Sequence, residues 1–340
     1  MSRLSRRSLL AGTSVVGVSA LAACADTDSA GTGSTDTGST DTGSGAGSAA
    51  AGPTVSTLFG DIAVPADPQS VVALGWGDME TCLALGTQVV GTSDWLAYGG
   101  DGVGPWAEDL VTQTPDQLGT LELSYEAVAA LTPDLILDTR SDNTQDKHDK
   151  LQEIAPTVGP PPGLTQLYGT SWQDQVTLVA AALAKDAEGA ALIADLEAKF
   201  TEAAAANPQF AGKTVTVGTY YSGGWGAYVT GDGRVDFMEA LGFTANPQIE
   251  ALKGDSFSVS LSAEQLGLLD ADLVVVFPIG LSASEITADP VLQALPATQA
   301  GRLVVLDDTT LTNAFSSATT LGLAHALENA VPLFAAAVPA

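Results

Sequence analysis

Aromatic side chains gather where predicted strands end, the part of an α/β protein at which ligands usually bind. The candidates are Trp76, Trp95, Tyr98, Tyr168, Trp172, Tyr220, Tyr221, Trp225 and Tyr228. Four of them fall in "TYYSGGWGAY" (219–228), together with three glycines, directly after a predicted strand. An aromatic-rich loop either plugs a core or lines a cleft. The glycines and the strand end favour a cleft wall.

Arginine is scarce in the folded part of the chain, which has only Arg140, Arg234 and Arg302. Arg140 ends the predicted strand "DLILDTR", and Arg234 begins the predicted helix "RVDFMEAL". A guanidinium offers a planar fork to carboxylate or catecholate oxygens, so both are candidate ligand donors. The alternative for each is a surface ion pair with the abundant acids. Arg302, in the turn "GRL", is expected to be structural, and Phe315 is a further candidate for the cleft.

The chain lacks the residues that metal binding, haem binding and several kinds of catalysis usually require. The chain has two histidines: His148 in the polar "QDKHDKLQ", expected to be solvated, and His325 on an apolar helix. Exported zinc or manganese sites usually draw on several histidines with carboxylates, so we expect no metal site. Haem ligation by histidine is not expected either, although ligation by tyrosine stays open. The G-x-S-x-G, H-E-x-x-H and Walker motifs do not occur, and we expect neither an enzyme nor a cofactor.

The charge of the chain limits its partners. The formal net charge is −28, and removal of an N-terminal signal with three arginines leaves nine basic against 40 acidic residues, a net charge of −31. Such a protein is not expected to bind nucleic acid or anionic lipid surfaces. The acidity fits either a salty exterior or a function. Of the two cysteines, Cys82 lies in a predicted helix as a small core residue, so no disulfide is expected.

The N-terminus has the pattern of an export signal. Arginines at 3, 6 and 7 precede an apolar run too short to span a bilayer, so 1–23 is predicted to be a signal peptide. Leu21-Ala22-Ala23-Cys24 resembles the lipobox of bacterial lipoproteins, which implies a lipidated Cys24; the alternative is an incidental cysteine at a cleavage site. "SRRSLL" resembles a twin-arginine signal, and the export route stays open. Residues 24–54, rich in Gly, Ser, Thr and Asp, are predicted to be a disordered linker.

The rest of the chain alternates strands and helices. Strands are predicted at 70–74, 88–92, 134–138, 214–221, 272–277 and 302–307, with periodic helical segments between them. This order is typical of parallel α/β units.

An internal repeat divides the chain into two halves. "LSYEAVAALTPDLIL" (123–137) aligns without gaps to "LSAEQLGLLDADLVV" (261–275), each with a helix, a turn and a strand. The Ala-rich segment 171–206 between the halves is predicted to be a long helix with one weak point, Gly189. We therefore predict an α/β fold of two similar Rossmann-like lobes, 55–170 and 207–340, joined by a long helix, with a ligand cleft between them.

Several segments together resemble the ABC-transporter substrate-binding proteins for iron–siderophore complexes, a class III periplasmic binding protein family related to B12- and haem-binding lipoproteins. They are "SVVALGWGDMETCLALGTQVVGTS" (70–93), "SYEAVAALTPDLILDTR" (124–140), "LQEIAPTV" (151–158), "LSAEQLGLLDADLVVV" (261–276) and "AGRLVVLDD" (300–308). The resemblance implies a ferric siderophore as ligand and an ABC permease as partner. It also implies that Glu126 and Glu264 dock onto the permease; the alternative is that both only favour a helix N-terminus.

The resulting hypothesis is a monomeric binding protein, anchored by lipid to the outer face of the cytoplasmic membrane, that delivers a ferric siderophore to a permease. Iron enters only as part of the bound chelate. Haem or cobalamin in the same fold is one alternative. Another is a surface lipoprotein that captures a sugar or peptide, or a hydrolase, with no role in transport. The sequence leaves the particular siderophore and the permease open.

Overall fold

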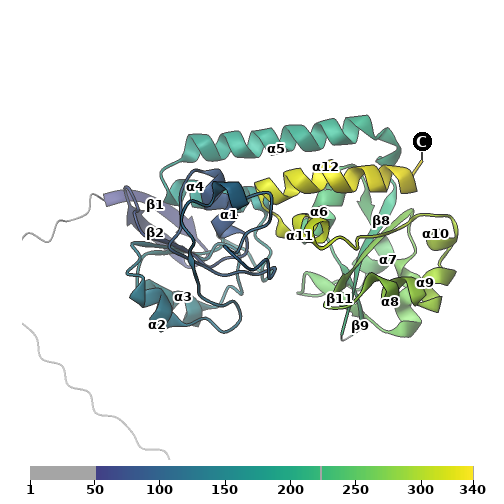
Figure 1. Cartoon of the computed structure of the whole chain (residues 1–340), viewed down its shortest axis with the longest axis horizontal. Coiled ribbons are helices and arrows are strands. Elements are labelled where there is room, and N and C mark those ends of the chain that lie inside the picture. Colours follow the sequence, from purple (N-terminus) through teal and green to yellow (C-terminus); the bar gives the residue numbers. More distant parts are fainter. Residues whose placement is uncertain (1–50, 223, 340) are drawn as a thin grey trace, which may run out of the picture. The chain divides into compact units, whose positions relative to one another are not determined.

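The computed structural model describes residues 51–222 and 224–339, which belong to one compact unit. It contains two α/β lobes (Figure 1). The predicted signal, Cys24 and most of the predicted linker lie outside the described residues. Among the helices that are described, none combines the length and the apolar character needed to cross a membrane.

The N-terminal lobe consists of a hairpin, a parallel sheet and flanking helices. Its elements are β1 (Ala51–Thr57), β2 (Gly60–Pro65), β3 (Val71–Ala73), α1 (Asp78–Ala84), β4 (Gly91–Thr92), the 3₁₀ helix η1 (Glu108–Leu110), β5 (Asp116–Gln117), α2 (Tyr125–Ala130), β6 (Leu135–Leu137), α3 (Gln145–Gln152), β7 (Thr157–Val158) and α4 (Trp172–Ala182). The sheet order is β5-β4-β3-β6-β7, with all strands parallel. Because β1 pairs with β2, residues 51–54 form part of a strand and not of the predicted linker.

The segment predicted to be one long helix, 171–206, forms two. The chain turns after α4, where Ala184 has a φ of 55°, and continues as α5 (Asp186–Ala206). Gly189 does not interrupt α5. A Cβ at this position would lie 2.4 Å from the Cβ of Ala180, so the glycine allows α4 and α5 to pack closely. The long helix that joins the lobes is therefore α5 alone.

The C-terminal lobe has a longer, mixed sheet. Its elements are the 3₁₀ helix η2 (Pro208–Phe210), β8 (Thr214–Tyr221), β9 (Gly224–Tyr228), α6 (Gly233–Ala240), β10 (Thr244–Ala245), α7 (Pro247–Glu250), β11 (Ser258–Leu261), the 3₁₀ helix η3 (Ala263–Leu269), β12 (Leu273–Ile279), α8 (Ala283–Ala288), α9 (Pro290–Ala294), α10 (Pro296–Gln299), β13 (Leu303–Val305), α11 (Thr309–Ser317) and α12 (Thr320–Ala337). The order is β11-β9-β8-β12-β13, and β10 also pairs with β8. The prediction of parallel units fails for β9 and β11, which run antiparallel to their neighbours.

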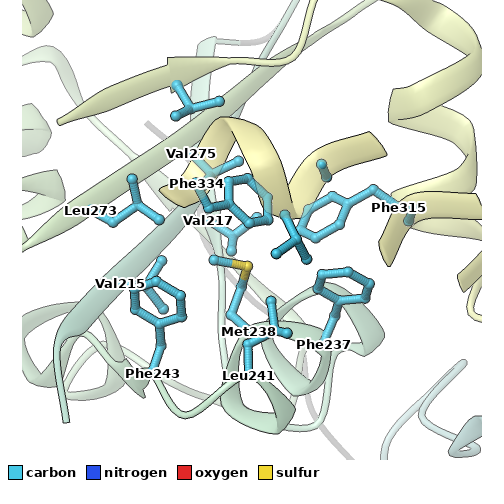
Figure 2. Packing of buried hydrophobic residues seen from close by; sticks show 14 of the residues in the cluster. Val215, Val217, Phe237, Met238, Leu241, Phe243, Leu273, Val275, Phe315 and Phe334 are labelled. Carbon is cyan, nitrogen blue, oxygen red and sulfur yellow. The ribbon is translucent and has the colours of Figure 1, made fainter. Parts of the chain in front are cut away.

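Alternation along the buried strands fills both faces of each sheet. In β12, Leu273, Val275 and Phe277 belong to one core cluster, whereas Val274 and Val276 belong to the cluster on the other face. The first cluster also includes residues of α5, α6, α11 and α12 (Figure 2). The helix α12 packs along α5 and also contacts α1 of the other lobe. These helices hold the two lobes together on one side.

Candidate functional site

The buried carboxylate of Asp78 holds together the loops that follow β3 and β6. It accepts hydrogen bonds from the backbone N–H groups of Gly75 and Thr139, both at 3.0 Å, and from the Thr139 hydroxyl. Gln175 of α4 adds a hydrogen bond of 2.8 Å from its Nε2. Burial raises the pKa of Asp78, and these hydrogen bonds oppose the rise. The ends of both strands are thus fixed to each other and to α4.

Two arginines, one from each lobe, approach the indole ring of Trp76: Arg140 from the loop after β6 and Arg234 from α6. The Cζ atoms of Arg140 and Arg234 lie 4.8 Å and 5.8 Å from the centre of the Trp76 ring, within the range of cation–π attraction. Gly233, at the start of α6, allows close packing against Ala318, because a Cβ there would lie 2.9 Å from Ala318 Cβ. We call Trp76, Arg140 and Arg234 the interlobe cluster.

Arg234 is neutralised inside its own lobe. Its Nε and Nη2 donate to the two oxygens of Asp232 at 2.9 and 2.7 Å, and its Cζ lies 3.7 Å from the centre of the Tyr228 ring. Burial alone lowers the pKa of Arg234, but the Asp232 carboxylate and Tyr228 more than offset it, so the pKa is raised. The pair is buried and bidentate, the geometry that best compensates a desolvated guanidinium.

Arg140 is engaged in a different way. It forms no ion pair within the described residues; its Nε donates to the Tyr168 carbonyl at 3.0 Å and its Nη1 to the Ser317 carbonyl at 3.4 Å. Ser317 belongs to the C-terminal lobe, so Arg140 ties the lobes together. Burial lowers the pKa of Arg140 to about 10, Asp232 opposes that fall, and Arg234 adds to it.

Aromatic side chains of the N-terminal lobe form a groove beside Arg140. The indole of Trp95 donates to the Leu74 carbonyl at 2.8 Å and packs edge-on against Tyr168, with ring centres 5.3 Å apart. Both line a groove of about 290 Å³ with Leu121 and Tyr125. We call this the aromatic groove, defined by Trp95, Leu121, Tyr125 and Tyr168. Its walls suit apolar or flat parts of a ligand.

A second buried carboxylate connects the lobes close to Trp76. Glu80 of α1 accepts hydrogen bonds from the hydroxyl of Thr319, which caps α12, and from Trp106 Nε1 at 3.0 Å. Burial raises the pKa of Glu80, and these hydrogen bonds oppose the rise. Tyr98 and Trp76 line a small cavity next to this carboxylate. The Tyr98 hydroxyl and Trp76 Nε1 are buried there without a hydrogen-bond partner among the described residues.

Three predicted cleft residues belong to the hydrophobic core instead. Residues 219–221 and 224–228 are strands of the β8–β9 hairpin and not a loop. Trp225 and Tyr228, three residues apart on β9, enter the cores on opposite faces of the sheet. Tyr228 still contributes indirectly, as the platform under Arg234. Phe315 has no exposed surface and packs between Phe237 and Phe334 (Figure 2). We therefore remove all three from the candidate ligand contacts.

The remaining predicted residues lie at the edges of the site. Tyr220 and Tyr221 are half-buried at the end of β8, where the Tyr220 ring packs at a tilt against Trp225 with ring centres 4.7 Å apart. Trp172 begins α4 and lines a groove of about 520 Å³ with residues of α5, α6 and α12. We call this the hinge groove, defined by Trp172, Phe200, Asp236 and Leu323. Arg302 donates to the carbonyls of Ala271 and Asp272, in agreement with its predicted structural role.

Sequence reasoning missed the acids that position the site. Asp232 has a signal in retrospect, because an aspartate directly before a helix is a common N-cap, and its side chain caps α6. Asp138 directly follows β6 and accepts from Lys147 at 2.9 Å in a largely buried ion pair. Asp78 and Glu80, in the predicted helix "DMETCLAL", have no local signal for burial. Their partners lie far away in sequence.

The histidines differ from expectation in one case. His148 is buried and not solvated, because its ring stacks on Phe59 of the β1–β2 hairpin with centres 4.2 Å apart. His325 of α12 is half-buried against Trp106. Within the described residues no group of His, Cys, Asp and Glu is arranged to hold a metal ion. Cys82 is fully buried, as its place in α1 predicts.

The two repeat glutamates are exposed, one on each lobe. Glu126 lies in the first turn of α2, after the N-cap Ser124, whose hydroxyl accepts from the Ala127 N–H at 3.2 Å. Glu264 lies in the first turn of η3, after Ser262. Both are free to meet a partner, and both also sit where a carboxylate favours a helix N-terminus.

Comparison with known proteins identifies the family. The model of the periplasmic binding protein family matches residues 71–310. The "Probable siderophore-binding lipoprotein YfiY" of Bacillus subtilis is 30% identical over 270 residues, which cover 74% of this chain and 78% of the relative.

Solved structures agree with this match. A periplasmic solute binding protein from Mycobacterium smegmatis is 28% identical with a TM-score of 0.72, covering 84% of this chain and 99% of that one. PiaA of Streptococcus pneumoniae, solved in complex with ferrichrome, is 24% identical with a TM-score of 0.70 and covers 84% and 98% of the two chains. The fold prediction of two α/β lobes is confirmed.

Proposed function

Because the chain belongs to the periplasmic binding protein family, we propose that it captures a ferric siderophore between its lobes and delivers it to an ABC permease. The identity to a siderophore-binding lipoprotein over most of both chains is the observation that carries this proposal. PiaA, with the same fold, is solved with ferrichrome. A protein of this family binds a substrate for uptake and performs no covalent chemistry on it.

The interlobe cluster supports this role. Trp76 and the aromatic groove offer flat, apolar walls, and the guanidinium of Arg140 lies between the lobes where a ligand would contact both. Because Arg140 donates to the Ser317 carbonyl across the lobes, lobe separation breaks that hydrogen bond. Ligand entry and lobe movement are thereby linked, while α5 and α12 restrict the movement to a small rocking.

We further propose that Cys24 carries the lipid anchor and holds the protein at the outer face of the membrane. The support is the lipobox-like "LAAC" (21–24) and the lipoprotein relative. In cells, the Cys24→Ala protein is expected to move from the membrane fraction to the medium and to lose labelling by a palmitate analogue. Retention in the membrane with the label would contradict the anchor.

The direct test is a tryptophan-fluorescence titration of the chain from residue 24 with Cys24→Ala. The ligands are ferric hydroxamate, catecholate and citrate chelates, with haem, cobalamin and zinc for comparison. Saturable quenching by a ferric chelate is expected. Binding of haem or cobalamin alone would show that the protein carries one of these ligands and not a ferric siderophore. No binding of any ligand would refute the proposal.

Two matched variants locate the ligand. Trp76→Phe, in the interlobe cluster, is expected to reduce the fluorescence change on binding. Trp225→Phe, in the core of the C-terminal lobe, is expected to leave it unchanged. The reverse order would place the ligand away from Trp76.

A further inference from the structure

Protein acceptors engage nearly all the cations of the described chain. Apart from Lys199, on the exposed side of α5, every Lys and Arg in residues 51–222 and 224–339 makes a hydrogen bond or an ion pair with a carboxylate, hydroxyl or carbonyl oxygen. The whole chain has 12 basic against 40 acidic residues, so cations are scarce to begin with. Their distribution near the interlobe cluster decides which ligand charges can be compensated.

Near that cluster each cation already has its acceptors. Arg234 is held by both oxygens of Asp232, at 2.9 and 2.7 Å. Lys147, half-buried in the wall of the aromatic groove, is paired with Asp138 at 2.9 Å. Arg140 donates to carbonyl oxygens of both lobes. Arg234 and Lys147, each paired with a carboxylate, offer little net positive charge to an incoming anion. Arg140 keeps its charge but is buried, and two of its donors are engaged by carbonyls.

Carboxylates, by contrast, line both neighbouring grooves. Glu122, Asp142 and Asp146 line the aromatic groove together with a single cation, Lys147. The hinge groove is lined by Glu197, Asp236 and Glu239, with no Lys or Arg among its lining residues. Burial raises the pKa of Asp236 to about 6, which leaves it mostly ionised at neutral pH.

An anionic ligand would meet two penalties at such a site. An anion moved out of water needs a compensating charge or hydrogen bonds. Of the nearby cations, Arg234 and Lys147 are already paired with carboxylates, and Arg140 is buried with its Nε and Nη1 bonded to carbonyls. Around the site, a chain with a net charge of −28 slows the approach of anions and favours that of cations. A ligand without negative charge meets neither penalty and still uses the aromatic walls.

We propose that the siderophore bound here is a ferric trihydroxamate chelate that carries no net negative charge. This inference rests on the proposed function. Three hydroxamate groups cancel the charge of ferric iron, whereas three catecholate groups leave a complex with a triple negative charge. The aromatic groove then contacts the neutral chelate, and surrounding carboxylates favour a chelate with a pendant ammonium.

A charge series on one iron core tests the proposal. Ferrioxamine B carries a pendant ammonium, its N-acetyl derivative is neutral, and its N-succinyl derivative ends in a carboxylate. Titrated against the chain from residue 24 with Cys24→Ala, the ammonium and acetyl forms are expected to bind, with the succinyl form about tenfold weaker. A ferric tris-catecholate is expected not to bind. A succinyl form that binds as tightly as the acetyl form would overturn the inference.

Two variants test whether the residues around the interlobe cluster cause the affinity difference between the acetyl and succinyl forms. Asp232→Asn keeps the cap on α6 but releases the charge of Arg234, so the gap between acetyl and succinyl forms is expected to shrink several-fold. Asp272→Asn is the matched control: it removes an equal charge beside Lys213 and Arg302, at the opposite end of the strands, and should leave the gap unchanged. Should Asp232→Asn fail to fold, Asp138→Asn releases Lys147 in the same way. An unchanged gap in the folded variant would contradict the proposal.

The outcomes separate the two proposals. Preference for the tris-catecholate or for citrate would overturn the charge inference and leave the role in siderophore uptake intact. Failure of every ferric chelate to bind would refute the proposed function itself, and the inference with it.

Discussion

The two lobes share the same aspartate hydrogen bonds at the start of their strands. At the other end of the sheets, the two lobes engage their arginines in different ways. At the start of the strands, Asp134 accepts from the backbone N–H groups of Gln69 and Ser70, at 2.7 and 2.9 Å. Its repeat partner Asp272 accepts from the N–H and hydroxyl of Thr214, at 2.9 and 3.0 Å. Each aspartate thus ties the start of the neighbouring strand. This end is the same framework in both lobes.

At the other end the lobes diverge. The C-terminal lobe pairs Arg234 with an acid of its own, whereas the N-terminal lobe extends Arg140 to a carbonyl of its neighbour. The sheets diverge as well: one is fully parallel with short strands, and the other adds the antiparallel β9 and β11. The repeat therefore specifies the helix, turn and strand that are common to both lobes. The residues at the interface between the lobes lie outside the repeat and differ.

The largest expected effect separates the two arginines. Arg234→Ala leaves the buried Asp232 without its partner, which should lower the free energy of unfolding by about 3–5 kcal/mol. Arg140→Ala removes a cation bonded only to carbonyls and should cost about 1 kcal/mol. Urea denaturation of both variants, with Lys199→Ala on the exposed side of α5 as a surface control, measures this. If both variants lost the same free energy of unfolding, Arg234, paired within its lobe, and Arg140, bonded across the lobes, would not differ in their contribution to stability.

The pH dependence of Asp236 gives the next effect. Its pKa in the folded protein is raised to about 6 by burial, so between about pH 4 and 6 the folded state binds more protons and stability falls as pH rises. Asp236→Asn should therefore stabilise the protein at pH 8 by about 2 kcal/mol, with no gain at pH 4. Asp195→Asn, on the exposed side of α5, should change little at either pH. A gain that is the same at both pH values would show that burial of charge is not its cause.

The shared framework predicts similar, smaller losses. Asp134→Ala and Asp272→Ala each remove two hydrogen bonds at the start of a strand and should each cost about 1–2 kcal/mol at neutral pH. Hydrogen bonds from Thr214 lower the pKa of Asp272, so its contribution is present above the usual pKa and is lost as pH falls below it. Thermal denaturation at pH 7 and pH 2.5 checks both points. A large difference between the variants at pH 7 would break the equivalence of the repeats.

The smallest effect on stability is expected at the exposed glutamates. Glu126→Ala with Glu264→Ala should change the free energy of unfolding by less than about 0.5 kcal/mol each and should not alter ligand affinity. If they dock onto the permease, uptake of the ferric chelate by cells falls strongly. The control is Glu153→Ala with Glu202→Ala, also exposed, which should leave uptake normal. Normal uptake in both double variants would return Glu126 and Glu264 to a role at helix N-termini.

Local patterns in the sequence determined much of this protein. Runs of β-branched residues placed β3, β6, β8, β12 and β13, because alternation along a buried strand is a local property. The repeat predicted two lobes, and the scarcity of arginine pointed to Arg140 and Arg234. The strands depend on residues close together in the chain, and the repeat and the arginine count can be found without knowledge of any contact.

Tertiary structure alone decided how these parts meet. Pairing with β8 and β11 makes β9 an inner strand of the sheet, so Trp225 and Tyr228 enter the cores on its two faces. His148 is buried because a hairpin from the start of the domain stacks Phe59 on it. Asp78, Glu80 and Arg140 gain their roles from acceptors and donors tens to hundreds of residues away. Burial of a charge is set by everything that surrounds it, so no short stretch of sequence encodes it.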